Sequence, residues 1–147
     1  MPKQIAKVGD VFWVSIEDGT YVLGQIVEIE KEVLNSITCA FFDVKKNSPE
    51  NESLDLSTPI SIQFVTKDLF NNGTWQRTTC ESVLIPENEL PYRDTIKEGW
   101  VGAKVIGSGI ICKFLSAFYG LRAWDEMHDP NYYQNLLLPG VKCRGNA

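Results

Sequence analysis

Residues 8–30 constrain what this chain can fold into more than any other stretch. Two runs rich in β-branched and aromatic residues, 11–17 and 20–30, flank the dipeptide Asp18-Gly19. Asp-Gly readily adopts the positive φ angles of a tight type I′ turn, so the stretch predicts an antiparallel hairpin. Gly24 interrupts the second run and predicts a bulge or a close approach of two backbones, since glycine otherwise weakens a strand.

The first run of the hairpin uses its two faces differently, because successive side chains of a strand point in opposite directions. Phe12, Val14 and Ile16 form a wholly apolar face, which predicts that this face is buried. Trp13 falls on the opposite, outward face together with Glu17. The outward position makes Trp13 a candidate contact for a partner.

Further strand-like runs follow the hairpin, at 36–44, 60–65, 75–79, 82–85 and 99–107. Bulky residues on both faces of 36–44 predict a strand buried on two sides, whereas 60–65 alternates and predicts half-burial. Residues 45–58 are mostly polar and predict a mobile loop.

Helical signals gather in the C-terminal third. Apolar residues recur at three-to-four residue spacing after Gly107, and Gly120 stands where a helix places its left-handed cap, which predicts a helix over 109–120. Asp129-Pro130 is a helix-start signal and predicts a second helix over 130–138. Together the elements predict one α+β domain over 1–147: a β-rich curved antiparallel sheet, or partial barrel, of six to seven strands, followed by two C-terminal helices.

Composition fits one soluble domain. The chain has 147 residues, of which 44% are hydrophobic and 22% charged, values that are ordinary for a globular protein. No apolar run is long enough to span a membrane, and the first residues lack the apolar core of a signal peptide. We therefore expect a cytoplasmic protein with no membrane partner.

Charge is unevenly placed along the chain. Residues 1–60 contain ten Asp and Glu against five Lys and Arg, while residues 61–147 contain nine of each. The acidic half disfavours nucleic acid and favours a basic partner. The candidate contacts are outward side chains of the hairpin and the residues just after it: Trp13, Glu17, Asp18, Glu28, Glu30 and Glu32. The alternatives are that these carboxylates only keep an edge strand soluble, or that residues 45–58 form the contact surface.

Catalytic signals are sparse. The single histidine, His128, lies within Trp124-Asp-Glu-Met-His-Asp129, where carboxylates are close in sequence but no second histidine or cysteine is. Gly107-Ser108-Gly109 lacks the lysine of a phosphate-binding loop and is better explained as a helix start. We expect no metal, no cofactor and no enzymatic activity. A small hydrolase centred on His128 is the weakest hypothesis.

The hairpin resembles one class of binding module. Gly9-Asp10-Val-Phe, Asp18-Gly19-Thr-Tyr and Gly24-Gln25-Ile-Val are similar to the opening of SH3-like barrels of the Tudor type. This resemblance implies a module that binds a peptide or small ligand, with Trp13 and Tyr21 as walls of an aromatic cage. The alternative for both residues is a place in the core or in a cross-strand pair, where aromatic residues of a hairpin lie more often.

A second resemblance uses more of the chain. Gly9-Asp10-Val-Phe, Tyr21-x-x-Gly24-Gln25, Gly73-Thr-Trp75 and the tail from Ala117 to Tyr132 resemble the twenty-sixth family of immunity proteins of bacterial polymorphic toxin systems. The resemblance implies a protein that binds a cognate toxin domain and neutralises it by occlusion. It leaves the toxin and the oligomeric state open. The family landmarks are Gly9, Asp10, Tyr21, Gly24, Trp75, Gly120, Trp124 and Asp125.

Overall fold

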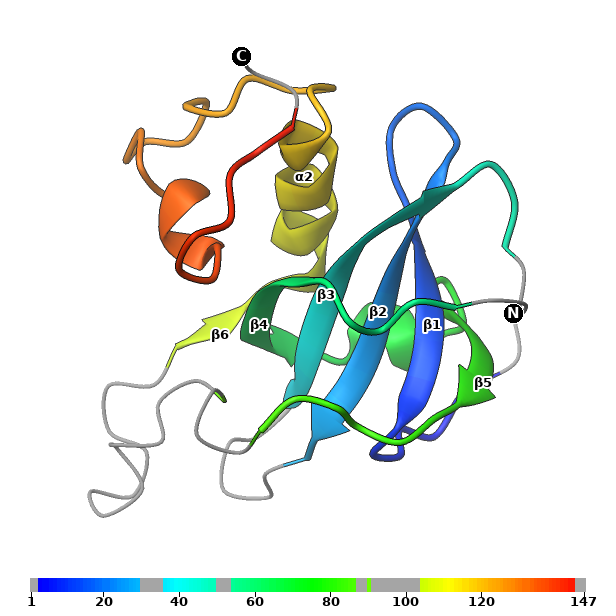
Figure 1. Ribbon diagram of the computed structural model, residues 1–147. Coiled ribbons are helices and arrows are strands. Elements are labelled where there is room, and N and C mark those ends of the chain that lie inside the picture. The colour runs from blue at the N-terminus through cyan, green and yellow to red at the C-terminus, as the bar shows by residue number, and fades with distance from the viewer. Residues whose placement is uncertain (1–2, 30–35, 50–53, 87–89, 91–103, 145–147) are drawn as a thin grey trace.

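The computed structural model describes residues 3–29, 36–49, 54–86, 90 and 104–144. Its strands form one six-stranded sheet in the order β5-β1-β2-β3-β4-β6 (Figure 1). The strands are β1 (Asp10–Ser15), β2 (Tyr21–Glu28), β3 (Ser36–Lys46), β4 (Pro59–Thr66), β5 (Gln76–Cys80) and β6 (Val105–Ile106). The predicted β-rich α+β fold is confirmed. The sheet is open rather than barrel-like, and it is mixed, because β6 runs parallel to β4 while the other described pairs are antiparallel.

The predicted hairpin is confirmed, but its turn is a different one. Ser15 pairs with Tyr21. The N–H of Gly19 donates to the carbonyl of Ile16 at 3.0 Å, so Glu17 and Asp18 occupy the centre of the turn. Gly19 follows them with a φ of 81°. The prediction of a type I′ turn centred on Asp18-Gly19 is wrong, because the turn lies one residue earlier. The Asp-Gly pair does not distinguish the two turns, since both place Gly19 at a position with a positive φ.

Gly24 marks a close approach, as predicted, although the neighbour is an aromatic ring rather than a second backbone. A Cβ at this position would lie 2.7 Å from Cζ of Phe12 and 3.2 Å from Cδ1 of Phe41. The pairing of β2 with β3 also shifts between Val22 and Gly24. The missing side chain therefore makes room for the aromatic core.

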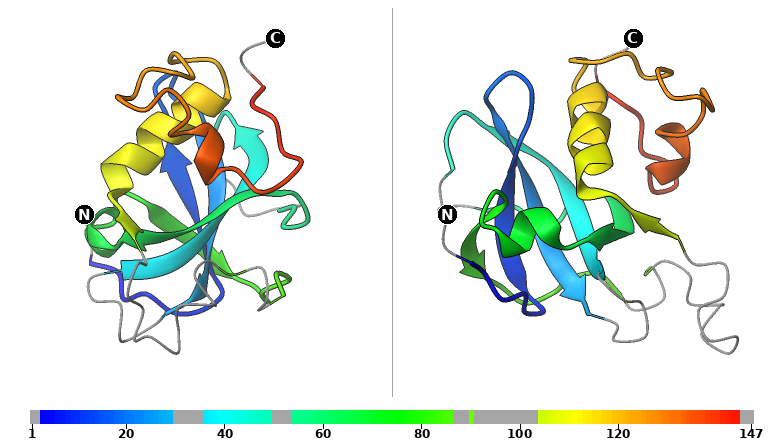
Figure 2. Two further views of the ribbon diagram at one scale, coloured as in Figure 1. Left: turned by 90° about the vertical axis from the view of Figure 1, so that its left-hand side faces the viewer. Right: turned by 180° about the vertical axis from the view of Figure 1, so that it is seen from behind.

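The sheet is buried on both faces. On one, the helix-covered face, Phe12, Phe41 and Trp75 pack beneath α1 (Asp68–Asn71) and α2 (Ser108–Phe118), and the rear view in Figure 2 shows both helices over it. On the other, the loop-covered face, Trp13 and Phe42 form a second cluster. Residues 54–58 and 81–86 cross that face without regular structure (Figure 1).

Two strand predictions are wrong in detail. Ser61 of β4 is fully buried rather than half-buried, and its hydroxyl donates to the carbonyl of Leu136 at 2.5 Å. The side chain of Gln63 donates to the same oxygen at 3.1 Å, so the C-terminal segment covers this strand. Residues 82–85 form no strand. Of the run predicted at 99–107, residues 99–103 lie outside the described residues and β6 is the described part.

The first C-terminal helix is confirmed as α2. The N–H groups of Gly120 and Leu121 donate to the carbonyls of Ala117 and Ser116, the hydrogen-bond pattern of a Schellman cap. The second helix, predicted over 130–138, is a single 3₁₀ turn, η3 (Gln134–Leu136). The helix does not continue to residue 138, because the N–H of Leu138 donates to the carbonyl of Ile60 in β4 at 2.8 Å instead of to a helical carbonyl.

The stretch 45–58 is only partly a polar loop. β3 continues to Lys46, and Leu56 is buried in the second cluster. Residues 50–53 lie outside the described residues, and mobility of the loop stays a prediction. No helix within the described ranges is long and apolar enough to cross a membrane.

Candidate functional site

The acidic residues predicted as contacts do not gather on one surface. Glu17 and Asp18 lie in the hairpin turn, whereas Glu28 ends β2, a strand of eight residues. A strand rises about 3.3 Å per residue, so roughly 20 Å separates the two positions. Glu30 and Glu32 lie outside the described residues. The structure therefore divides the predicted acidic surface in two.

The two carboxylates in the turn already have partners. Glu17 pairs with Arg122 at 3.1 Å, and Arg122 also pairs with Glu126 at 2.7 Å. Asp18 accepts a hydrogen bond from the hydroxyl of Thr20 and pairs with Lys45 at 3.0 Å. The Thr20 hydroxyl first and then Lys45 lower the pKa of Asp18 to about 2. These ion pairs connect the hairpin turn to β3 and to the segment after α2.

A second set of contacts extends this hairpin-tip network to the C-terminal segment. The ammonium of Lys45 lies 5.6 Å from the ring centroid of Tyr119, whose hydroxyl donates to Asp43 at 2.8 Å. Asp43 also accepts from Nε of Arg144 at 2.7 Å. Burial, followed by the hydrogen bond to Asp43, raises the pKa of Tyr119. The contacts within this network account for its charged residues, so no toxin contact is needed to explain them.

Trp13 is not an outward contact. Its side chain is 2% exposed and packs in the second cluster with Phe42 and Leu56. The outward placement was wrong because the alternation of β1 reveals two faces but cannot show that loops cover the second one. Tyr21 packs against the same cluster, so these two residues do not form the open aromatic cage that the Tudor-type resemblance implies.

Several landmarks meet where β1, β2 and β5 come together. Gly9 lies so close to β5 that a Cβ there would be 2.8 Å from the carbonyl oxygen of Glu81. The side chain of Gln25 donates to the carbonyls of Gly9 and Glu81 at 3.3 and 3.0 Å. Asp10 is buried and accepts hydrogen bonds from the N–H of Lys7 and from Arg77. This junction holds the sheet edge together.

The aromatic landmarks are packing residues. Trp75 stacks on Phe12 with the rings 5.3 Å apart and 7° from parallel. The ring of Trp124 packs against those of Phe114 in α2 and Tyr133, with centroids 6.0 and 5.6 Å away. Asp125 is exposed.

His128 is exposed. The described part of the chain contains no group of three or more His, Cys, Asp or Glu side chains that could hold a metal ion. Asp129 accepts the N–H of Asn131 at 2.9 Å within a turn. Its predicted role at a helix start is wrong, because η3 begins only at Gln134.

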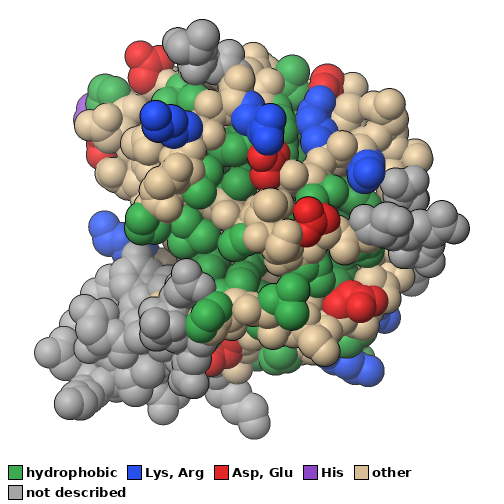
Figure 3. Space-filling model, in the orientation of Figure 1, with side chains coloured by type: hydrophobic (Ala, Val, Ile, Leu, Met, Phe, Trp, Pro, Cys, Tyr) green, Lys and Arg blue, Asp and Glu red, His purple; other side chains and the backbone are tan. Residues whose placement is uncertain are grey.

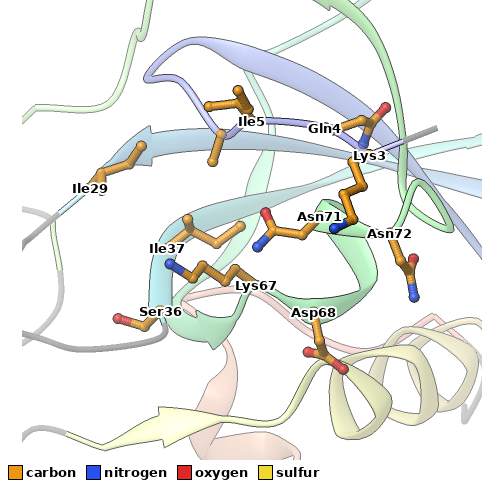
Figure 4. Close-up of a pocket in the computed structure, with 11 residues that line it drawn as sticks. Lys3, Gln4, Ile5, Ile29, Ser36, Ile37, Lys67, Asp68, Asn71 and Asn72 are labelled. Atoms are coloured by element: carbon orange, nitrogen blue, oxygen red, sulfur yellow. The ribbon is translucent and has the colours of Figure 1, made fainter.

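A groove that the sequence reasoning missed lies between the N-terminal segment, α1 and the start of β3 (Figure 4). We call it the N-terminal groove, and its volume is about 590 Å³. Its apolar part is formed by Ile5, Ile29 and Ile37. Most of its polar part is formed by the ammonium groups of Lys3 and Lys67 and the side-chain amide of Asn71. The one sequence feature that could have pointed to the groove is the placement of Ile5 between Lys3 and Lys7.

Gln4 builds one wall of the N-terminal groove. Its side-chain amide donates to the carbonyls of Phe70 and Trp75 at 2.7 and 2.8 Å, and its side-chain oxygen accepts the N–H of Arg77 at 2.9 Å. Its backbone N–H donates to Asn71. These bonds fix the backbone of the N-terminal segment. Ile5, the next residue, is 78% exposed to solvent.

The described polar lining of the N-terminal groove contains two lysines and one carboxylate. Asp68 is the one carboxylate among the described lining residues, and it accepts hydrogen bonds at 2.8 Å from the hydroxyls of Thr66 and Ser108. Thr66 first and then Ser108 lower the pKa of Asp68. Figure 4 shows its side chain turned toward α2, whereas Lys67 extends the other way. Asp68 stays ionised, so the described lining residues carry two positive charges, on Lys3 and Lys67, against one negative charge.

A family model described as Immunity protein 26 matches residues 7–102, well over half of the chain. The chain belongs to the Immunity protein 26 family. No curated protein and no solved structure matches it. The match contains the landmarks from Gly9 to Trp75, whereas Gly120, Trp124 and Asp125 lie beyond it.

The Immunity protein 26 match also bears on the surfaces described above. It includes strands β1 to β5 and α1, and therefore most of the lining of the N-terminal groove. Lys3 and Ile5 precede the matched residues. The groove is thus built mainly by the family's part of the chain and completed by its first described residues.

Proposed function

We propose that this chain neutralises a cognate bacterial toxin domain by binding and covering it in stoichiometric amounts, in the cytoplasm of the cell that makes the toxin or of its kin. The observation that carries the proposal is the Immunity protein 26 match over residues 7–102. An immunity protein protects either by covering its toxin or by a reaction that disarms it. We propose the first route.

Exposed apolar side chains support a binding role. Ile5 and Val8 are 78% and 52% exposed, although Gln4 fixes the segment that carries them. Figure 3 shows further hydrophobic side chains spread over the loop-covered face, where Leu84 is exposed. Apolar surface that gathers in water on a folded protein is typical of interaction sites.

Co-expression tests the proposal. The chain is produced together with the C-terminal toxin domain encoded by the neighbouring reading frame, and cell survival is scored before the complex is purified. We expect survival and a stable complex of fixed stoichiometry. Survival without a complex would contradict occlusion, and death of the co-expressing cells would contradict immunity toward that toxin.

A further inference from the structure

We infer that the N-terminal groove binds an extended acidic segment of the toxin domain that also carries an apolar side chain. The inference rests on the proposed function and adds where the partner binds and by what chemistry. The acidic hairpin predicts a basic partner, whereas the groove favours an acidic segment. The groove is preferred because the described carboxylates of the hairpin turn are paired within the chain.

The polar half of the groove selects for a carboxylate. Lys3 belongs to the N-terminal segment and Lys67 precedes α1, and Figure 4 shows the side chain of Asn71 between theirs. Ammonium groups and the amide NH₂ all donate hydrogen bonds, and a carboxylate accepts several at once. Because Asp68 is turned to the hydroxyls of Thr66 and Ser108, a partner's carboxylate has no competitor among the described lining residues. Complementary charge also steers the encounter.

The apolar half of the groove selects for a hydrophobic side chain. Ile5 is 78% exposed and Ile29 37% exposed, with Ile37 buried beneath the groove. Removing such surface from water favours association through the hydrophobic effect. The bonds of Gln4 hold Ile5 in place before a partner arrives, which lowers the entropy cost of binding.

The size of the groove favours a segment over a globular surface. Its volume of about 590 Å³ lies within the range of roughly 300–1,000 Å³ that is typical of pockets for small ligands. A few side chains fill that space. An extended loop or strand of the toxin can place a carboxylate by Lys3 and Lys67 and an apolar group by Ile5.

Calorimetric titration of chain variants with the purified toxin domain tests the inference. For the double variant Lys3→Glu with Lys67→Glu, we expect affinity to fall about tenfold or more, since like charges across an interface cost several kcal/mol. The salt dependence of binding should fall as well. Ile5→Ser should weaken binding through the apolar half alone.

Matched controls separate the groove from net charge and from hydrophobicity. The double variant Lys104→Glu with Lys142→Glu makes the same charge change at exposed positions outside the groove. Leu121→Ser makes the same kind of change at a leucine that lies outside the groove and is 37% exposed. We expect both controls to bind like the unmodified chain.

A photo-reactive residue in place of Ile5 provides an independent readout. Cross-linking in the complex followed by mass spectrometry should join position 5 to an acidic segment of the toxin. A cross-link only to this chain itself would overturn the inference. Groove variants that bind as tightly as the controls would also overturn it while leaving the proposed function intact, whereas an unmodified chain that fails to bind would overturn the proposed function.

Discussion

The ring of Phe12 lies so close to Gly24 on the neighbouring strand that a Cβ on Gly24 would fall 2.7 Å from Cζ of Phe12. The same ring stacks on Trp75 and meets Phe70 edge-on at 5.5 Å. One missing side chain on β2 thus lets an aromatic cluster join the hairpin to α1 and to the start of β5. The sheet that carries the N-terminal groove depends on this contact.

Gly24→Ala should therefore destabilise the protein. The added methyl group has no room, and overpacking of a core costs about 1–3 kcal/mol. Urea denaturation followed by tryptophan fluorescence would measure the loss in unfolding free energy.

Gly109→Ala is the matched control. A Cβ at this position of α2 meets nothing within 4 Å, and alanine favours a helix by up to about 1 kcal/mol over glycine. The control should leave stability unchanged or raise it. Equal losses at both positions would contradict the account of Gly24.

Gln4→Ala should loosen the wall of the N-terminal groove. It removes three side-chain hydrogen bonds, with an expected loss of about 1 kcal/mol, because water replaces part of each. Hydrogen exchange at the amide of Arg77 should become faster. Gln76→Ala, at an exposed neighbouring position, should leave that exchange unchanged, and unchanged exchange in Gln4→Ala would show that Gln4 does not hold the segment.

Ser61→Ala should weaken the docking of the C-terminal segment on β4. The buried hydroxyl donates to Leu136, and losing such a bond costs about 1 kcal/mol. Ser82→Ala, at an exposed position, should change the unfolding free energy by less than about 0.5 kcal/mol. Thermal unfolding of the two variants side by side would make the comparison.

Asp18 should stabilise the fold in a pH-dependent way. Its pKa falls from the ordinary 3.8 to about 2 in the folded chain, so its contribution is present above about pH 4 and disappears as the pH falls to about 2. The difference in unfolding free energy between the unmodified chain and Asp18→Asn should shrink over that range. We expect only about 0.5–1 kcal/mol, because solvent screens the partly exposed pair. A constant difference would contradict this role.

The sequence predicted elements whose signals are local. The hairpin, β3 and α2 follow from alternation, from a helical period and from glycines at their ends, which nearby residues determine. The burial of Ser61 and the short η3 escaped prediction, because both depend on a contact between β4 and Leu136 from far along the chain.

The functional surface was harder to predict than the fold. Counting carboxylates identified an acidic half of the chain, but it could not show that Asp18 and Glu17 have partners in Lys45 and Arg122. The N-terminal groove depends on Gln4 reaching Arg77, a contact without a periodic signature. Charge pairing and long-range contacts therefore decide which side chains a partner can meet.

The most direct test of neutralisation by binding is a titration of toxin activity with the purified chain. If the chain covers the toxin, activity should fall linearly and reach zero at a fixed molar ratio, with no further change on longer incubation. Loss of all activity at far lower amounts, progressing with time, would contradict the account and show that the chain disarms its toxin by catalysis, with His128 the first residue to substitute.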